Sequence, residues 1–201
     1  MSTSEQYWES FYSTGESRWS GKPNPSLVAE VADLEPGAAL DLGCGQGGDA
    51  IWLASRGWAV TAADISTAAL AIATRNAAAA GLSDAITWER HDLAASLPGG
   101  TFDLVAVAYL HSPVELPRTR ILRSSAEAVA PGGTLVIIGH APSRSHRHAD
   151  LPSPQRVVED LALPAGQWQL RTSDLRVTEH AFADETPTER TDSVVRLQRA
   201  R

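Results

Sequence analysis

Short apolar runs alternate along the chain with longer segments in which apolar residues recur every three or four positions. The runs are typical of strands, and the periodic segments are typical of helices that bury one face. The run at 102–108 is nearly all apolar, as expected for a strand buried on both faces. Strands are therefore predicted at 38–42, 58–63, 85–90, 102–108 and 134–139, with helices at 46–56, 66–80 and 117–130 between them.

Residues that favour helix ends support these boundaries. Ser66 is placed to cap the start of one helix, and Gly81 is placed to end it. Pro117 fits the first turn of the next helix, whose apolar face is predicted to include Val129. Pro131-Gly132-Gly133 then predicts a turn into the fifth strand.

The alternation of strands and helices predicts a parallel sheet with helices on both faces. The C-terminal part differs, because the strands predicted at 168–178 and 193–198 have no long helix between them and must run antiparallel. The predicted fold class is α/β: a Rossmann-like, doubly wound, mostly parallel seven-stranded sheet with an antiparallel C-terminal edge strand. Two N-terminal helices are predicted at 5–12 and 26–34, and one more at 155–163.

Composition fits one globular domain. The 201 residues include 43% apolar and 20% charged residues. The expected layout of the domain 1–201 is an N-terminal helical lid at 1–34, a cofactor-binding core at 35–140, and a segment at 141–201 that completes the sheet and carries a substrate loop.

Charge and hydropathy exclude several classes of protein. No apolar run reaches the roughly 18 residues of a membrane span, and the N-terminus lacks the basic and apolar stretches of a signal peptide. We therefore expect a cytoplasmic protein with no membrane partner. Cys44 is the one cysteine, so no internal disulfide is expected. The net charge of −7 disfavours nucleic-acid binding.

A glycine-rich segment, Asp41-Leu-Gly-Cys-Gly-Gln-Gly-Gly48, joins the first predicted strand to a helix. Glycines let a backbone turn sharply and approach a ligand closely, and a helix N-terminus presents free N–H groups. Asp64 ends the second strand, where an acidic side chain can accept hydrogen bonds from both ribose hydroxyls of a nucleoside. A glycine turn that binds no ligand is the alternative interpretation.

Asp41 separates two possible ligands of this loop. The spacing of Gly43, Gly45 and Gly48 also fits a dinucleotide fingerprint. A dinucleotide places its pyrophosphate over the loop, and the carboxylate of Asp41 would repel it. S-adenosylmethionine has no phosphate and carries an ammonium group that Asp41 can pair with, so Asp41 favours the methyl donor.

Asp41-Leu-Gly-Cys-Gly-Gln-Gly resembles the first motif of class I S-adenosylmethionine-dependent methyltransferases, acid-x-Gly-x-Gly-x-Gly. The resemblance covers roughly residues 25–140, and the predicted antiparallel tail agrees with the family's seven-stranded sheet. Trp8-x-x-x-Tyr12, Trp19 and the segment 47–50 are most similar to small bacterial members near the tellurite-resistance and thiopurine methyltransferases. Further segments in the family's order are Asp64-Ile-Ser, His91-Asp92-Leu, Phe102-Asp-Leu-Val-Ala-Val and Pro131-Gly-Gly-Thr-Leu.

The resemblance implies the cofactor S-adenosyl-L-methionine, with S-adenosyl-L-homocysteine as product. It assigns Asp64 to the ribose and Asp92 to the adenine amino group, although Asp92 could instead cap a turn. Cys44 stands where the family has a small residue, which favours a packing role over a nucleophilic one. The cofactor-binding residues expected on this basis are Asp41, Gly43, Cys44, Gly45, Asp64, Ile65, Asp92, Leu93 and Tyr109.

Tyr109 and His111 follow the fourth strand, whose end faces the transferring methyl group in this family. Both are candidate catalytic residues, and His111 could accept a proton from the acceptor because imidazole titrates near neutral pH. The alternative is that His111 only lines the pocket. A thiolate or amine needs no base, and then placing the nucleophile in line with the methyl supplies most of the rate.

Two further groups could contact the substrate. Trp8, Tyr12 and Trp19 could form a lid over the cofactor, or could simply dock the first helix onto the sheet. His140 and Arg144 begin a loop, 140–148, that is rich in His and Arg. This loop could face the substrate or be solvated; a metal site is not predicted because no matching ligands stand elsewhere.

The predicted function is methyl transfer by in-line displacement from S-adenosylmethionine to a small-molecule thiol, hydroxyl, amine or metalloid acceptor, by a monomer or homodimer. One alternative is a nicotinamide-dependent oxidoreductase. The only lysine, Lys22, precedes the glycine loop, so a Tyr-x-x-x-Lys pair is absent. The other alternative is a non-catalytic S-adenosylmethionine-binding protein. Nucleic-acid methylation is disfavoured, because Ala108-Tyr-Leu-His stands where base methyltransferases carry an Asp/Asn/Ser-Pro-Pro-aromatic motif.

Overall fold

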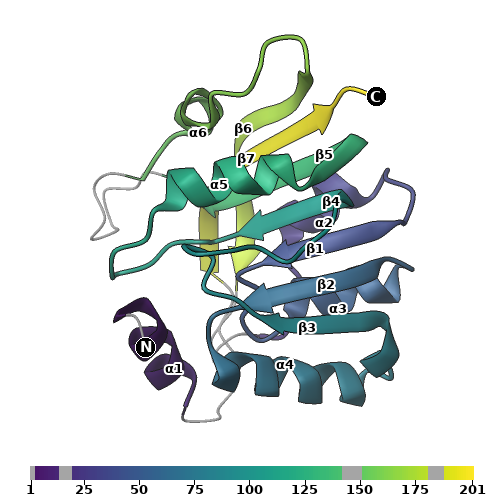
Figure 1. The fold of residues 1–201 in the computed structure, drawn as a ribbon, viewed down its shortest axis with the longest axis vertical. Helices are drawn as coiled ribbons and strands as arrows, with labels where there is room; N and C mark the ends of the chain where they lie inside the picture. Colours follow the sequence, from purple (N-terminus) through teal and green to yellow (C-terminus); the bar gives the residue numbers. More distant parts are fainter. Residues whose placement is uncertain (1–2, 14–19, 142–150, 181–187) are drawn as a thin grey trace.

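A seven-stranded sheet forms the centre of the computed structural model, which describes residues 3–13, 20–141, 151–180 and 188–201 (Figure 1). The strand order is β3-β2-β1-β4-β5-β7-β6. The first five strands are mutually parallel, and β7 runs antiparallel to both of its neighbours. The strands are β1 (Ala38–Leu42), β2 (Ala59–Asp64), β3 (Ile86–Arg90), β4 (Phe102–Ala108), β5 (Val129–His140), β6 (Trp168–His180) and β7 (Thr188–Arg199).

Helices connect the strands and cover both faces of the sheet, which confirms the predicted fold class. The predicted cap holds, because Ser66 Oγ accepts from the Ala69 backbone N–H at 3.1 Å. The helices are α1 (Thr3–Tyr12), α2 (Pro25–Val31), α3 (Gly48–Ser55), α4 (Thr67–Ala79), α5 (Arg118–Glu127) and α6 (Pro154–Leu161), with a 3₁₀ turn at Ser83–Ala85.

The strands divide two hydrophobic cores between the faces of the sheet. On β4, Leu104 and Ala106 belong to the core that includes residues of α2, α3 and α4. Val105 and Val107 alternate with them and belong to the core that includes residues of α5 and α6. This period of two, with both faces buried, explains why the run at 102–108 is apolar throughout.

The strand order refines the predicted sheet edge. The antiparallel strand is β7, and it lies between β5 and β6, so β6 forms the edge of the sheet (Figure 1). α2 lies in the segment predicted as a lid, yet its Leu27 and Val31 are buried in the core shared with α3 and α4. The lid hypothesis therefore concerns α1.

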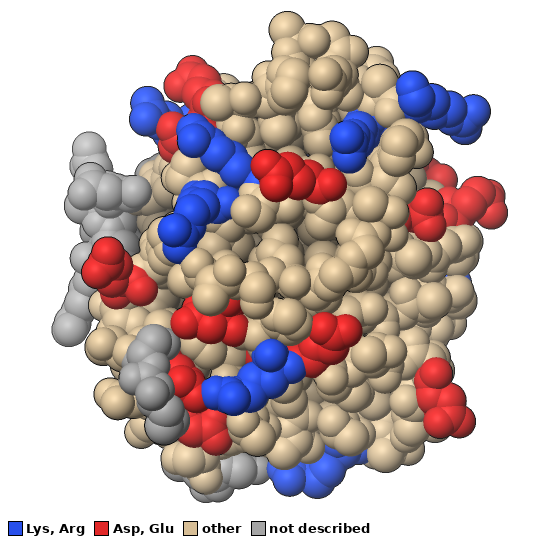
Figure 2. All heavy atoms as spheres, in the orientation of Figure 1, with Lys and Arg blue, Asp and Glu red and all other residues tan. Residues whose placement is uncertain are grey.

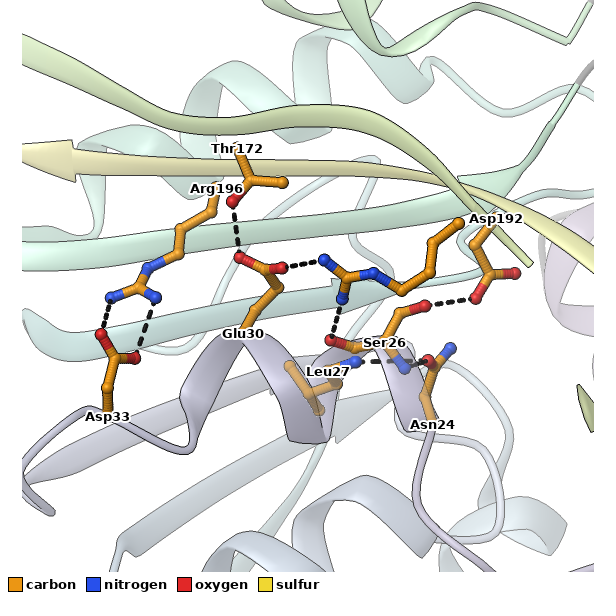
Figure 3. Close-up of polar contacts among 9 residues, drawn as sticks. Asn24, Ser26, Leu27, Glu30, Asp33, Thr172, Asp192 and Arg196 are labelled. Atoms are coloured by element: carbon orange, nitrogen blue, oxygen red, sulfur yellow. Dashed lines mark hydrogen bonds and ion pairs between the residues drawn. The ribbon is translucent and has the colours of Figure 1, made fainter. Parts of the chain in front are cut away.

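Polar side chains join α2 to the antiparallel strands (Figure 3). Glu30 accepts hydrogen bonds from Thr172 Oγ1 at 2.7 Å and from Arg176 at 2.5 Å. Asp33 pairs with both terminal nitrogens of Arg196, at 2.9 and 3.2 Å, and this contact lowers the pKa of Asp33. Glu30 is buried, so its two donors satisfy a carboxylate that would otherwise be costly to bury.

The region before the fifth strand differs from the prediction. The helix ends at Glu127, and Val129 is paired with Phe102 in β5 rather than lying on the helix. The predicted turn at 131–133 lies within β5, at an irregularity in its pairing with β4, and Gly132 has a φ of 84°. A bulge accommodates the turn residues without ending the strand.

Candidate cofactor and acceptor site

The glycine-rich segment folds back over the end of β2. The backbone N–H groups of Gly43 and Cys44 both donate to the carbonyl of Ala63, at 2.8 and 3.1 Å. Gly43 has a φ of 77° and Gly45 a φ of 52°, a left-handed conformation that favours glycine. The bend therefore favours glycine at these two positions.

The carboxylate of Asp64 fixes this bend through two hydrogen bonds from backbone N–H groups. Its Oδ2 accepts from the Gly45 N–H and its Oδ1 from the Ser66 N–H, both at 2.9 Å. Burial raises the pKa of Asp64, although the backbone donors oppose the rise. Each carboxylate oxygen has a second lone pair, so Asp64 retains the capacity to accept hydrogen bonds from a ligand.

Asp41 lies at the end of β1 and is only 2% exposed. Its Oδ2 is buried and makes no hydrogen bond to the described residues. Burial raises the pKa of Asp41 well above its usual range, and the charges of Asp49 and Asp64 raise it further. Asp41 and Asp64 thus interact electrostatically at the carboxyl ends of β1 and β2. The unbonded Oδ2 of Asp41 could accept a hydrogen bond from a cationic partner.

Two side chains cover the glycine bend. A Cβ on Gly45 would lie 3.0 Å from the hydroxyl of Tyr12, and one on Gly43 would lie 3.1 Å from Leu110 Cδ1. Tyr12 comes from α1 and is buried. Its ring stacks on that of Trp8, with centroids 6.2 Å apart. Of the three predicted lid aromatics, Tyr12 lies directly over the glycine bend; Trp19 lies outside the described residues.

Glu9 fixes α1 against the start of α4. Its Oε2 accepts from Ser66 Oγ at 2.9 Å and from the Ala68 N–H at 3.3 Å. A carboxylate at a helix N-terminus is stabilised by the free N–H groups there. Because Ser66 also donates its backbone N–H to Asp64, α1 is attached to the same turn that holds the ribose candidate.

Tyr109 follows β4 in a left-handed conformation, with a φ of 51°. Such a conformation is uncommon for residues other than glycine, and above all for bulky ones. It persists only where the surrounding structure stabilises it. Its ring stacks on that of His140 at a centroid distance of 4.3 Å, and His140 stacks on His111 at 5.5 Å. The structure thus brings together three of the predicted catalytic and substrate residues.

The hydrogen bond of His111 indicates which ring nitrogen carries its proton. The backbone N–H of His140 donates to His111 Nε2 at 3.3 Å. An acceptor nitrogen is unprotonated, so the neutral imidazole carries its proton on Nδ1. A base role for His111 Nε2 would require this hydrogen bond to open.

Asp192, on β7, was not predicted from the sequence. It is fully buried and accepts from Tyr109 Oη at 2.6 Å, from Ser26 Oγ at 2.6 Å and from Thr178 Oγ1 at 3.2 Å (Figure 3 shows the bond to Ser26). Burial raises the pKa of Tyr109 well above its usual value, and the negative charge of Asp192 is the second largest cause of the rise. The only sequence signal was an acidic residue next to the apolar run of a strand.

The structure also places the remaining predicted site residues that lie in its described ranges. Asp92 Oδ1 accepts from the Ala94 N–H at 3.0 Å and so caps a turn, while Leu93 packs against the core beside α5 and α6. Burial raises the pKa of the Cys44 thiol, which favours packing over nucleophilic chemistry. Ile65 is partly buried between Asp64 and Ser66. Arg144 lies outside the described residues.

The described ranges show no sign of a membrane span or of a metal site. They contain no helix long and apolar enough to cross a membrane, and no cluster of three or more His, Cys, Asp or Glu side chains able to hold a metal ion. A surface hollow of about 520 Å³ lies between residues 93–100 and α5, and its lining includes no residue of the glycine bend. The face in Figure 2 shows Lys and Arg interspersed with Asp and Glu rather than gathered in one basic patch.

Comparison with known proteins agrees with this geometry. Residues 39–133 match a family described as a methyltransferase domain. Methyltransferase GfsG from Streptomyces halstedii is 30% identical over 134 residues, which is 65% of this chain and 48% of that protein. The chain spans between a third and about half of the length of the curated relatives it matches.

Three solved structures share the fold over nearly the whole chain. One, described as "Conversion of a Disulfide Bond into a Thioacetal Group during Echinomycin Biosynthesis", has a TM-score of 0.74 and 25% identity, and the match covers 98% of this chain and 93% of that one. TehB from Haemophilus influenzae gives 0.71 and 18%, covering 98% and 67%. NodS from Bradyrhizobium japonicum, in complex with S-adenosyl-L-homocysteine, gives 0.72 and 18%, covering all of both chains.

These similarities support the family predicted from the sequence, the class I S-adenosylmethionine-dependent methyltransferases. The match to a methyltransferase domain covers residues 39–133, which include the glycine bend and the two acids beside it. The likeness to TehB at 18% identity concerns the fold.

Proposed function

We propose that this protein transfers the methyl group of S-adenosylmethionine to a small-molecule acceptor by in-line displacement. When bound, the cofactor supplies a methyl group on a sulfonium and leaves as S-adenosylhomocysteine. The observation that carries the proposal is the unpaired, buried Oδ2 of Asp41 beside a glycine bend that Asp64 anchors.

The two acids suit two different parts of this cofactor. Asp41 would pair with the ammonium of the amino-acid end, since a buried carboxylate with an open position gains most from a cation. Asp64 would accept from the ribose hydroxyls with its remaining lone pairs. Asp92 already caps a turn, and it would contact the adenine with its second oxygen, beside Ile65 and Leu93.

Asp41 disfavours the nicotinamide alternative. A pyrophosphate over the bend would place negative charge near Asp49 and Asp64, whose charges already raise the pKa of Asp41. Repulsion between like charges in a poorly solvated site is strong. A dinucleotide would therefore bind weakly, if at all.

The acceptor would lie near Tyr109, His111 and His140. These residues are only partly buried, and their stacked rings offer a flat surface for a small polar molecule. Thiols, hydroxyls, amines and metalloids all remain candidate acceptors. The structural neighbour described for a disulfide-to-thioacetal conversion is a reason to assay thiols first.

Tyr109 would orient the acceptor rather than deprotonate it. Its hydroxyl donates to Asp192, and its raised pKa keeps the phenol protonated at neutral pH. His111 would be the base where the acceptor needs one, with Nε2 released from the His140 N–H. In the proposed layout, α1 covers the cofactor, residues 35–140 bind it, and the C-terminal segment completes the sheet.

The test is a turnover assay with a radiolabelled methyl donor and a panel of thiols, hydroxyls, amines and metalloids. We expect label transfer to one class, with loss of turnover in Asp41→Asn. Cofactor binding without label transfer to any class would support a non-catalytic binding protein instead. Transfer at unchanged rate in Asp41→Asn would contradict the role given to Asp41.

A further inference from the structure

The guanidinium of Arg118, the first residue of α5, lies beside the candidate acceptor residues. Its Nε donates to the carbonyl of Leu110 at 3.1 Å. A Cβ added to Gly139 would lie 3.0 Å from His111 Nε2 and 3.7 Å from Arg118 Nη2. The imidazole and the guanidinium therefore approach the same point of β5, and the glycine at 139 leaves the space that both occupy.

Leu110 connects this guanidinium to the glycine bend. Its Cδ1 is the atom nearest to a Cβ added to Gly43, at 3.1 Å, and its carbonyl accepts from Arg118. One residue thus contacts the bend through its side chain and Arg118 through its backbone. A group bound at Arg118 would therefore lie one residue away from the proposed cofactor site and directly beside His111.

Arg118 has no counter-ion among the described residues. None of them forms an ion pair with it, and its two terminal nitrogens donate no hydrogen bond to them. α5 has no acidic residue in its first turn. The charge of Asp160, on α6, acts on Arg118, but Asp160 is itself bonded to Arg156 at 2.8 Å. The guanidinium therefore has two nitrogens available to an anionic ligand.

Partial burial makes this positive charge costly unless a ligand neutralises it. Arg118 is half-buried, and burial lowers the pKa of its guanidinium. The group still stays protonated, because arginine titrates far above neutral pH. An anion offsets the cost of leaving a poorly solvated charge unpaired. Two nitrogens of a guanidinium match the two oxygens of a carboxylate in a bidentate arrangement.

The charges around Arg118 favour a ligand with a single negative charge. The buried acid Asp192 is bonded to Ser26 of α2, whereas Arg118 belongs to α5, and the two helices cover opposite faces of the sheet. The whole chain carries a net charge of −7. One guanidinium neutralises a carboxylate, but it would leave one charge of a dianionic phosphate uncompensated in an acidic protein. A carboxylate is therefore favoured over a phosphate.

We propose that Arg118 is a specificity-determining residue, and that the methyl acceptor carries a carboxylate that Arg118 binds beside His111. This inference rests on the proposed function, since it names a class of acceptor for the same site. A carboxylate bonded to a guanidinium is a poor nucleophile, because the cation stabilises its charge. The methyl group would therefore go to a thiol, hydroxyl or amine elsewhere on the acceptor.

Binding of an unreactive carboxylate tests the site without turnover. Benzoate is titrated calorimetrically into the free protein and into its complex with S-adenosylhomocysteine, and benzamide serves as the uncharged isostere. Benzoate should bind at least about tenfold more tightly than benzamide, in line with hydrogen bonds to a charged group. Arg118→Gln should remove this preference. Arg120→Gln is the matched control and should keep it, because Arg120 is an exposed arginine of the same helix that donates to the Ala94 carbonyl.

A conservative variant separates binding from a structural role. Arg118→Lys keeps the positive charge but lacks the guanidinium that donates to Leu110. It should retain part of the preference for benzoate. A role limited to the contact with Leu110 would instead be lost equally in Arg118→Lys and Arg118→Gln, and that result would overturn the proposal.

Turnover gives a second readout. Each acceptor is assayed as the carboxylate and as its amide, beginning with 3-mercaptopropionate and 3-mercaptopropionamide. The carboxylate should have the lower KM, because Arg118 would bind it equally in the ground state and the transition state. In Arg118→Gln the KM for 3-mercaptopropionate should rise about tenfold or more, to the level of the amide.

Equal affinity of the wild-type chain for benzoate and benzamide would overturn the proposal, as would no binding of benzoate at about 10 mM. So would a preference that survives in Arg118→Gln, or tighter binding of phenyl phosphate than of benzoate. An absence of methyl transfer to any acceptor, with the Arg118-dependent preference for benzoate intact, would count against the proposed function alone. The titration of the free protein tests Arg118 even if S-adenosylhomocysteine fails to bind.

Discussion

The hydroxyl of Tyr109 donates a 2.6 Å hydrogen bond to Oδ1 of Asp192, which lies 83 residues further along the chain. The bond joins the end of a parallel strand to the antiparallel strand β7, in which Asp192 stands opposite His140. Tyr109 is thereby held in its left-handed conformation with its ring against His140. The C-terminal strands thus help to position the acceptor side of the candidate site as well as completing the sheet.

Tyr109→Phe should lower the free energy of unfolding by about 1.5–3 kcal/mol, the range for a hydrogen bond to a charged group. Asp192 keeps Ser26 and Thr178 as donors, which places the expected value at the lower end. Urea unfolding measures the change, with S-adenosylhomocysteine binding as the control. A stability equal to that of the wild-type chain would show that Asp192 does not need this donor.

Gly45→Ala should abolish most cofactor binding, while Gly81→Ala should leave it intact. Both glycines have positive φ, 52° and 71°, so an added Cβ strains both backbones by about 1–2 kcal/mol. Only at Gly45 would that Cβ meet a neighbour, the Tyr12 hydroxyl at 3.0 Å, whereas nothing lies within 4 Å at Gly81. Thermal unfolding and calorimetry on both variants separate the two effects. Equal loss of binding in both would mean that backbone strain alone disrupts the site.

Asp41→Asn should stabilise the free protein at neutral pH and weaken its cofactor binding. The raised pKa of Asp41 means that the folded chain holds a proton that the unfolded chain releases above pH about 4. This contribution to stability is therefore fully present at low pH and is lost as pH rises through the folded pKa. If Asp41→Asn raises the free energy of unfolding by about 1 kcal/mol, Tm should rise by about 2–4 °C in a chain of this size.

The pH dependence provides the control for this variant. Between pH 4 and 8, the wild-type Tm should fall more steeply with rising pH than that of Asp41→Asn. Asp33, whose pKa is lowered, has the opposite sign: its contribution is present above its unfolded pKa and is lost on acidification below it. Parallel Tm curves for Asp41→Asn and the wild-type chain would contradict the burial of an ionisable Asp41.

Local patterns were sufficient to predict the sheet and the glycine bend. The cap at Ser66, the glycine bend and the fully apolar β4 each follow from a few neighbouring residues. Val129 was misassigned because its apolar spacing fits a helix as well as a strand, and pairing with Phe102 decided the outcome. Such a choice depends on a partner strand that is distant in the sequence.

Long-range contacts at the site could not be read from the chain. Asp192 contacts Ser26 and Tyr109 across 166 and 83 residues, and no local pattern links these positions. Likewise, the placement of Tyr12 over Gly45 depends on how α1 docks through Glu9. Sequence motifs predicted the glycine bend, which forms within a short backbone segment, whereas contacts between residues distant in the sequence required the structure.

His111→Gln tests whether the acceptor needs a base. Glutamine keeps an acceptor for the His140 N–H but cannot take up a proton at neutral pH. For a hydroxyl acceptor we expect kcat to fall about 10²–10⁴-fold, the range for a lost general base, with the acidic limb of the pH profile removed. For an acceptor that is already a thiolate or amine, kcat should change little. A loss of kcat that leaves the pH profile unchanged would instead indicate a role in packing.

The most direct measurement of the central claim is isothermal titration calorimetry of S-adenosylhomocysteine into the wild-type chain, Asp64→Asn and Asp84→Asn. Asp84 is an exposed acid away from the glycine bend, so its variant controls for the change in charge. We predict binding to the wild-type chain and to Asp84→Asn, and affinity about 10–100-fold lower for Asp64→Asn, in line with the loss of charge-assisted hydrogen bonds. An absence of binding to the wild-type chain, or equal affinity for all three proteins, would contradict a glycine bend and Asp64 that hold this cofactor.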